Sequence, residues 1–332
     1  RDCLELMGCY GPGKVFRFAE ILAATCLALD ISTSAAIIAN EFVRAHERLG
    51  RNRPVKQLTK DSIDTKFFAS LFPDRNTRVF SFEGLPLQQD ASIITKLLQD
   101  RSKSLVGIFR YRLQVENGSG SKIIPAVLKL KSADHHLIDI GASLARLSGE
   151  DRLPGLFENQ FHIFGFNNSN MREIGFYRHA KKEILRYAPK IYGAKIDDER
   201  ELFATLMEDL SSFSHIDTAN DISLWDDQSI RAVLHDLACM HAVYFNDFGA
   251  IPEEVMVNTL NKETLCGAYE FLSELTDYNA RQFPNLITAE CREVYLDFLS
   301  HLSERIDEMH AFPMTLTHND FNYRNICLRD VS

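Results

Sequence analysis

Residues 316–328 read Leu-Thr-His-Asn-Asp-Phe-Asn-Tyr-Arg-Asn-Ile-Cys-Leu, and the interpretation of the chain starts from this stretch. It places Asp320 two residues after His318 and five residues before Asn325, between short apolar runs. A carboxylate can accept the proton of an attacking hydroxyl, and a nearby amide oxygen can hold Mg²⁺ beside a phosphate. The spacing therefore predicts a polar loop suited to phosphate chemistry.

The pattern H-x-D-x-x-x-x-N resembles the catalytic loop of the aminoglycoside-phosphotransferase and choline-kinase-like families. The resemblance implies an ATP- and Mg²⁺-dependent transfer of a phosphoryl group to the hydroxyl of a small molecule. It also implies roles for three residues: Asp320 as the catalytic base, Asn325 as a metal ligand and His318 as support for the loop.

Upstream of the loop, the apolar run Ile123–Leu130 contains Lys129 near its end and predicts a strand. The turn-rich segment 117–121 should join it to a preceding strand over 105–115. Kinase-like enzymes place the lysine that binds the ATP phosphates on the third strand of a small sheet, so the resemblance assigns this role to Lys129. Lys131 lies two residues further on the same strand face and remains the alternative.

The segment Met171–Tyr177 resembles the E-x-x-F-Y helix of choline-kinase-like proteins, and the resemblance implies that Glu173 pairs with Lys129. Residues 202–207 predict another strand, followed by a Glu-Asp-Leu hinge in which Glu208 and Leu210 would meet adenine. Residues 234–244 resemble the first large helix of the family's C-lobe.

The predicted fold class is α+β: a bilobal protein-kinase-like fold with a small β-sheet N-lobe and hinge over 92–210 and a helical C-lobe over 211–332. Only Gly107 lies where a Gly-rich phosphate loop would be expected. The second metal-binding Asp of such folds follows on the next strand, so we expect it beyond Ser332 and expect the C-lobe to be incomplete.

Residues 17–46 read RFAEILAATCLALDISTSAAIIANEFVRAH and resemble the C-terminal end of class I HMG-CoA reductase, with the similarity covering about 1–54. The resemblance implies NADPH-dependent reduction of a coenzyme A thioester to mevalonate, with His46 protonating the departing thiolate. It also implies a homo-oligomeric reductase whose remaining site lies upstream of Arg1. Two helices are expected, over 14–29 and from Ser32 onward, followed by a linker over 55–91 with one short helix.

Composition and charge argue against several classes of function. The chain has 332 residues and a net charge of −9, without a basic block, which argues against nucleic-acid binding. Seven scattered cysteines lack metal-ligand spacing and indicate reduced thiols in a cytoplasmic protein. The apolar segment Ile21–Ile31 is too short to cross a bilayer, so no membrane segment is expected.

The sequence thus predicts part of a bifunctional parent that joins HMG-CoA reductase to a small-molecule kinase. The kinase part would phosphorylate a hydroxyl acceptor that the sequence does not identify. The 332-residue piece alone is expected to be inactive. The alternative is a degenerate kinase-like module that binds a ligand or regulates the reductase without catalysing transfer.

Overall fold

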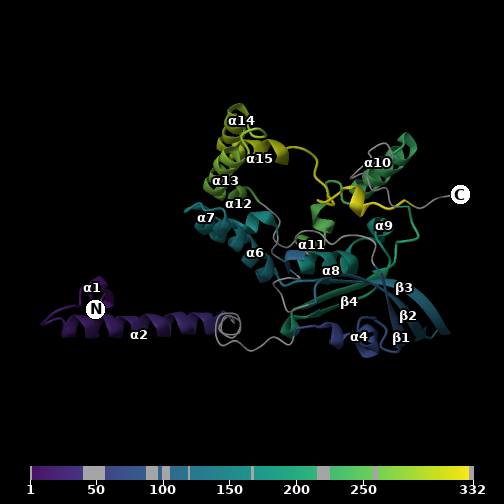
Figure 1. Ribbon diagram of the computed structural model, residues 1–332, viewed down its shortest axis with the longest axis horizontal. Coiled ribbons are helices and arrows are strands. Elements are labelled where there is room, and N and C mark those ends of the chain that lie inside the picture. Colours follow the sequence, from purple (N-terminus) through teal and green to yellow (C-terminus); the bar gives the residue numbers. More distant parts are fainter. Residues whose placement is uncertain are drawn as a thin grey trace. The chain divides into compact units, whose positions relative to one another are not determined.

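The computed structural model describes residues 2–39, 57–86, 96–98, 105–118, 120–165, 168–214, 225–256 and 261–328. The chain divides into two compact units, residues 1–56 and 57–332. Each unit is described by itself, with its elements labelled in Figure 1.

The first unit contains a short helix, α1 (Asp2–Leu6), and a long helix, α2 (Val15–Ile38). The prediction of two helices with a break before Ser32 was wrong, because α2 runs through that position without interruption. Neither Gly nor Pro occurs between Val15 and Ile38, so nothing in the backbone chemistry forces a break.

Helix α2 is also longer than Ile21–Ile31, the apolar segment on which the expectation of no membrane span was based. Its 24 residues include a window with a mean hydropathy of 1.9, and none of that window is buried. By length and composition alone it is able to cross a bilayer, a property shared by signal sequences and by core helices of soluble proteins. The expectation that no segment has the length of a membrane span is therefore corrected.

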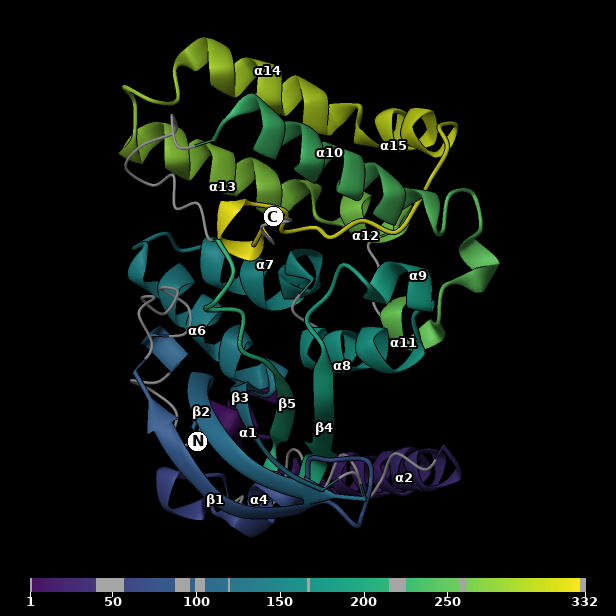
Figure 2. The ribbon, with the colours of Figure 1, turned by 90° about the vertical axis from the view of Figure 1, so that its right-hand side faces the viewer.

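The second unit is built on a five-stranded antiparallel sheet with the order β1-β2-β3-β5-β4 (Figure 2). The strands are β1 (Arg78–Leu85), β2 (Gly107–Asn117), β3 (Gly120–Lys131), β4 (Ile191–Asp197) and β5 (Leu202–Glu208). The hairpin of β2 and β3 and the strand β5 agree with the prediction, whereas β1 and β4 were not predicted as strands. The class is therefore mixed α+β.

Residues 57–86, which were expected to lie in a linker, belong to this sheet unit. They supply strand β1, the 3-10 turn η1 (Lys60–Ser62) and helix α4 (Thr65–Ala69). Asp64 caps α4 by accepting a hydrogen bond from the amide of Phe67 at 2.7 Å. Phe67 and Phe68 are buried against Leu113 and Leu128 of the sheet. Burial of two aromatic rings gives this segment a structural reason to be ordered rather than a tether.

Helices follow β3 and precede β4. They are α6 (Asp134–Leu147), α7 (Leu153–Gln160), the 3-10 turn η2 (Phe161–Phe164), α8 (Ser169–His179) and α9 (Lys182–Leu185), and η3 (Asp198–Arg200) joins β4 to β5. Ile174 of α8 packs with Ala133 and with Phe203 of β5. This contact places α8 against the sheet beside the end of β3.

Most of the described residues after β5 form helices, as predicted for the C-lobe. The elements are α10 (Asp227–Ala242), η5 (Phe248–Ala250), α11 (Glu253–Met256), α12 (Lys262–Gly267), α13 (Tyr269–Gln282), α14 (Ala289–Ser300), α15 (Leu302–His310) and η6 (Tyr323–Asn325). Helix α13 packs with α7 around the buried side chains of Phe157 and Phe271. An antiparallel sheet with helices inserted between β3 and β4 and further helices after β5 is neither specific to a kinase-like bilobal fold nor at odds with one.

Candidate functional site

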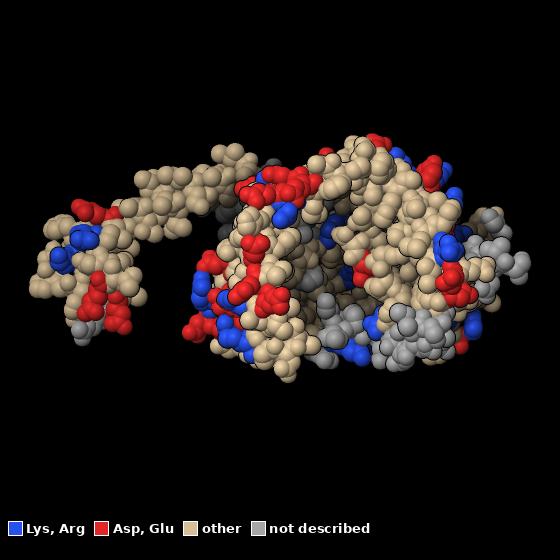
Figure 3. All heavy atoms as spheres, turned by 90° about the horizontal axis from the view of Figure 1, so that it is seen from above, with Lys and Arg blue, Asp and Glu red and all other residues tan. Residues whose placement is uncertain are grey.

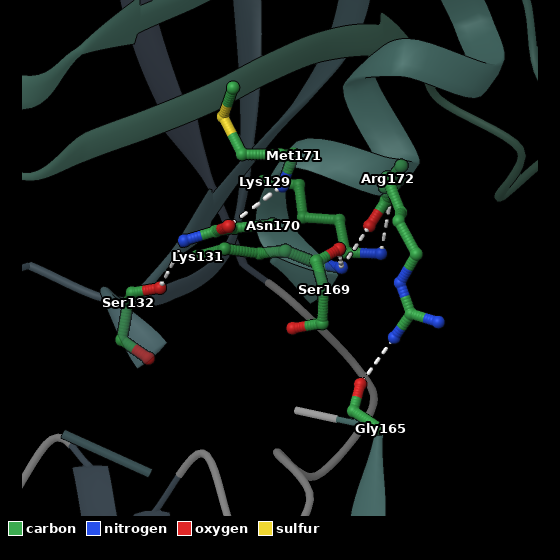
Figure 4. A network of polar contacts seen from close by, with 9 residues as sticks. Lys129, Lys131, Ser132, Gly165, Ser169, Asn170, Met171 and Arg172 are labelled. Carbon is green, nitrogen blue, oxygen red and sulfur yellow. Dashed lines mark hydrogen bonds and ion pairs between the residues drawn. The ribbon is translucent and has the colours of Figure 1, made fainter. Parts of the chain in front are cut away.

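Two lysines of β3 meet one carboxylate of α8 (Figure 4). Lys129 Nζ lies 2.8 Å from Glu173 Oε1, and Lys131 Nζ lies 2.6 Å from Glu173 Oε2. The ion pair between Lys129 and Glu173 that the resemblance implied is therefore present in the structure. The competing residue, Lys131, shares the same carboxylate, so the pair alone does not choose between the lysines.

Further contacts distinguish these two lysines. Lys131 Nζ also donates a hydrogen bond to the carbonyl of Ser169 at 3.0 Å, at the start of α8. Among the described residues, Lys129 Nζ has Glu173 as its hydrogen-bond acceptor. Lys131 thus ties β3 to α8 by two contacts, whereas the described residues give the ammonium of Lys129 one acceptor, Glu173.

Burial and neighbouring charges shift the pKa values of Lys131 and Glu173 in opposite directions. Burial lowers the pKa of Lys131, and Glu173 partly restores it. Burial alone would raise the pKa of Glu173, but Lys129 and Lys131 more than offset it and hold that pKa below its ordinary value. Glu173 is therefore a carboxylate at neutral pH, which is the form that can hold an ammonium.

The residues that follow β3 hold the first turn of α8 in place through hydrogen bonds. Asn170, which is 3% exposed, donates from Nδ2 to the carbonyl of Ser132 at 3.1 Å. The amide of Asn168 donates to the carboxylate of Asp134. Because α8 is fastened at its start, Glu173 is presented to the lysines by a rigid element rather than by a loop.

A close helix–helix approach adds to this placement. A Cβ at Gly175 would lie 2.6 Å from Cβ of Glu254 in α11, so only glycine fits there without a shift. Gly175 is two residues beyond Glu173 in the same helix. The position of Glu173 thus depends on α11 as well as on the sheet.

The predicted hinge is anchored by an arginine that sequence reasoning did not identify. Arg110 of β2 donates to Oδ2 of Asp209 from Nε at 3.0 Å and from Nη2 at 2.8 Å. The side chain of Asp209 is only 4% exposed. Burial would raise the pKa of Asp209, but hydrogen bonds from Arg110 and Ser211 lower it below its ordinary value. No local signal pointed to Arg110, since 99 residues separate the pair.

Both predicted hinge residues use backbone groups in local structure. The amide of Glu208 donates to the carbonyl of Lys190 at 2.9 Å, and Glu208 Oε1 accepts from the amide of Lys190 at 2.7 Å. The carbonyl of Leu210 accepts from the amide of Phe213 at 2.9 Å. These contacts shape the segment; a role of Glu208 and Leu210 in binding adenine stays a prediction.

The loop around Asp320 is organised by side-chain amides. Asn325 Nδ2 donates to Asp320 Oδ2 at 2.8 Å and to its carbonyl at 2.7 Å. Asn322 Nδ2 donates to Asp320 Oδ1 at 2.8 Å. Both carboxylate oxygens are thereby oriented, and the predicted partners Asp320 and Asn325 lie in direct contact.

His318 lies beside this loop. Its ring packs edge-on against that of Phe321, with centroids 5.9 Å apart. Asn319 between His318 and Asp320 has a φ of 62°, in the left-handed region that asparagine tolerates better than most residues. The backbone therefore bends at Asn319, between His318 and Asp320, and the role of His318 in supporting the loop stays a prediction.

The ends of the loop are fastened to other elements. Thr315 Oγ1 donates to the carbonyl of His241 in α10 at 2.5 Å. Leu316 packs against the buried cluster that contains Tyr244. At the other end, Leu328 and Ser214 exchange two backbone hydrogen bonds of 2.8 and 3.0 Å. Ser214 lies shortly after the hinge, so the loop ends beside the segment that leads out of the sheet.

The ion pair and the loop remain separate features. Within the described residues, neither Lys129 nor Glu173 forms a hydrogen bond or an ion pair with Asp320 or Asn325. The face of the second unit seen in Figure 3 is hollowed, and Lys or Arg side chains lie within the hollow.

His46, predicted as a catalytic acid, lies outside the described residues.

Comparisons with known proteins concern the N-terminal segment. The family model for hydroxymethylglutaryl-coenzyme A reductase matches residues 1–51. The 3-hydroxy-3-methylglutaryl-coenzyme A reductase of Methanocaldococcus jannaschii is 45% identical over 51 residues, which are 15% of this chain and 13% of that protein. That of Methanothermobacter thermautotrophicus is 44% identical over 50 residues, with the same shares. No solved structure matches the chain significantly.

Proposed function

We propose that the second unit belongs to an ATP-dependent phosphotransferase acting on the hydroxyl of a small molecule. The observation that carries the proposal is the ion pair of Lys129 and Glu173, which joins the third strand of the sheet to the helix α8. Kinase-like enzymes need such a lysine–glutamate pair to hold the nucleotide phosphates. The organised loop of Asp320 and Asn325 supports the same reading.

Each residue has a distinct part in the proposed reaction. Lys129 would balance the charge of the ATP phosphates, and Glu173 would hold its ammonium in place. Asp320 would accept the proton of the acceptor hydroxyl while the hydroxyl oxygen bonds to the γ-phosphorus and ADP departs with its electron pair. The side-chain amide nitrogen of Asn325 donates a hydrogen bond to Asp320. The amide oxygen of Asn325 is then left to act as the proposed Mg²⁺ ligand.

The test of this proposal measures ADP formation in a parent that extends beyond Ser332, with Mg²⁺-ATP and a panel of amino alcohols, aminoglycosides and mevalonate. Asp320→Asn should reduce transfer by about 10²- to 10⁴-fold, because it removes the base while keeping the shape of the side chain. Asp297→Asn, on an exposed face of α14, is the matched control and should leave the rate unchanged.

The same assay decides between an enzyme and a degenerate module. Equal turnover in the parent and in Asp320→Asn would remove Asp320 as the base. Nucleotide binding without transfer to any acceptor on the panel would favour the ligand-binding or regulatory module instead. Robust turnover by the 332-residue chain itself would contradict the expectation that this piece is inactive.

For the first unit, we propose that the parent carries a HMG-CoA reductase, which would use NADPH and a coenzyme A thioester and would form a homo-oligomer. The match of residues 1–51 supports this proposal. The chain spans only 13% of the length of the curated relatives, so the activity is assigned to the parent and not to the segment.

The reductase proposal has its own test. In the parent, His46→Gln should slow NADPH-dependent thioester reduction, since glutamine cannot give a proton to the departing thiolate. Thermal unfolding should stay unchanged as a control for folding. Reduction at the parental rate would remove His46 as the acid.

We propose the cytoplasm as the compartment of the parent. All seven cysteines are free thiols, as expected in a reducing environment. Cell fractionation tests this: recovery of the parent in the membrane fraction after a carbonate wash would point instead to insertion of the apolar helix α2. A small molecule, rather than nucleic acid, is the proposed partner.

A further inference from the structure

A group of metal-binding side chains lies outside the candidate phosphotransferase site. It consists of His135 and His136, at the start of α6, and Glu201, in the turn between β4 and β5. One ligand atom from each of the three residues lies within 4.8 Å of the others.

Sheet topology explains why residues distant in sequence meet here. Strands β3 and β5 are antiparallel neighbours, with Lys131 opposite Phe203. The end of β3 and the beginning of β5 therefore lie at one edge of the sheet. The two histidines follow β3, and Glu201 immediately precedes β5. A cation at this edge would connect α6 directly to the β4–β5 turn.

The distances suit metal ligation better than direct hydrogen bonding. Nε2 of His135 lies 3.6 Å from Oε1 of Glu201, and Nε2 of His136 lies 3.5 Å from Oε2. Good N–H···O hydrogen bonds span about 2.7–3.2 Å. Two donors bound to one tetrahedral Zn²⁺ at about 2.0–2.2 Å are about 3.3–3.5 Å apart. Each histidine nitrogen thus lies near a different carboxylate oxygen, at a separation close to that of two donors on one ion.

One imidazole nitrogen of the cluster has no hydrogen-bond partner among the described residues. Nε2 of His136 is buried and has no hydrogen-bond partner in the described part of the chain. Gln57 Nε2 donates to Oε2 of Glu201 at 3.3 Å, which orients the carboxylate toward the histidines. A buried imidazole nitrogen without a partner is costly unless something occupies it. Outer hydrogen bonds to a ligating carboxylate are a common feature of metal sites.

We propose that His135, His136 and Glu201 bind one Zn²⁺ ion, with water completing the coordination. Two imidazoles and one carboxylate form a ligand set that Zn²⁺ accepts readily. The three ligands belong to two elements of the sheet unit, so the ion acts as a clamp between α6 and the β4–β5 turn. This site is independent of phosphoryl transfer and needs no part of the reductase.

The test titrates the full 332-residue chain, freed of metal with a chelator, with Co²⁺ as a spectroscopic probe and with Zn²⁺ by calorimetry. We expect one Co²⁺ site whose spectrum lacks thiolate charge transfer, since the ligands are nitrogen and oxygen, and whose Co²⁺ is displaced by Zn²⁺. A spectrum dominated by thiolate would assign the binding to the seven cysteines and overturn the proposal.

Three variants locate the site. His135→Gln, His136→Gln and Glu201→Gln should each weaken Zn²⁺ binding at least tenfold and abolish the rise in Tm that Zn²⁺ causes in the unaltered chain. His179→Gln is the matched control, because His179 faces a single carboxylate, Glu254, at 3.7 Å. It should bind Zn²⁺ as the unaltered chain does.

Circular dichroism of each metal-free variant establishes folding before titration. If one histidine variant fails to fold, the other histidine variant and Glu201→Gln carry the test. Unchanged Zn²⁺ affinity in the folded variants would show that the three residues form a histidine–glutamate ion pair only.

Discussion

Lys129 and Glu173 are 44 residues apart in the chain, yet Nζ of the lysine lies 2.8 Å from Oε1 of the glutamate. The second carboxylate oxygen of Glu173 binds Lys131 at 2.6 Å. One carboxylate thus organises both lysines at the end of β3. The contact also connects the sheet to α8, so changes in these residues should affect both ligand binding and stability.

Lys129→Met and Lys131→Met should differ in their effect on nucleotide binding. Lys131 is engaged by both Glu173 and the carbonyl of Ser169, whereas Lys129 is held by Glu173. Lys129→Met should therefore cause the larger loss of Mg²⁺-ATP affinity, of tenfold or more, measured by calorimetry. A larger loss in Lys131→Met would reverse the assignment of the phosphate-binding lysine.

Glu173→Gln should alter how stability depends on pH. The pKa of Glu173 is held below its ordinary value, so its contribution is present above about pH 4.3 and is lost as pH falls through the folded-state pKa. At pH 7 the variant should lose about 1–3 kcal/mol, because two ammonium groups lose their partner. Urea unfolding followed by circular dichroism should show this gap narrowing at pH 3. A gap of constant size would contradict the ionic role.

Arg110→Gln should destabilise the second unit by about 3 kcal/mol, because it leaves the carboxylate of Asp209 without its cation in a site that is only 4% exposed. Arg112 on the same strand offers a matched control. It pairs with Glu83 at 2.8 Å, but both side chains are more than half exposed. Arg112→Gln should cost at most about 0.5–1 kcal/mol. Equal losses in the two variants, by urea unfolding, would show that Asp209 gains little from burial.

Gly175→Ala should destabilise the unit by about 1–3 kcal/mol, since the added Cβ would lie 2.6 Å from Cβ of Glu254. Displacement of α8 should also weaken nucleotide binding through Glu173. Gly155→Ala in α7 is the control, because nothing lies within 4 Å of its Cβ position. That change should stabilise the helix by about 0.5–1 kcal/mol. Thermal unfolding checks both signs, and a neutral Gly175→Ala would mean that α11 yields easily.

Short-range patterns explain the successful structural predictions. The apolar runs on each side of the turn at 117–121 predicted the β2–β3 hairpin, and residues 171–177 fell within α8. These elements depend on neighbours a few residues away, which a sequence shows directly. The same logic failed for α2, where Ser32 suggested a helix start although no backbone break was required.

By itself, the sequence determined the polar loop at Asp320, the lysine-bearing strand and the reductase-like segment, because each is written in contiguous residues. Tertiary structure alone decided that residues 57–86 complete the sheet, that Arg110 holds Asp209, and that Glu201 faces His135 and His136. These pairings follow from strand order and register. Register brings together residues that are dozens of positions apart, and no local pattern of charge or hydrophobicity specifies which ones will meet.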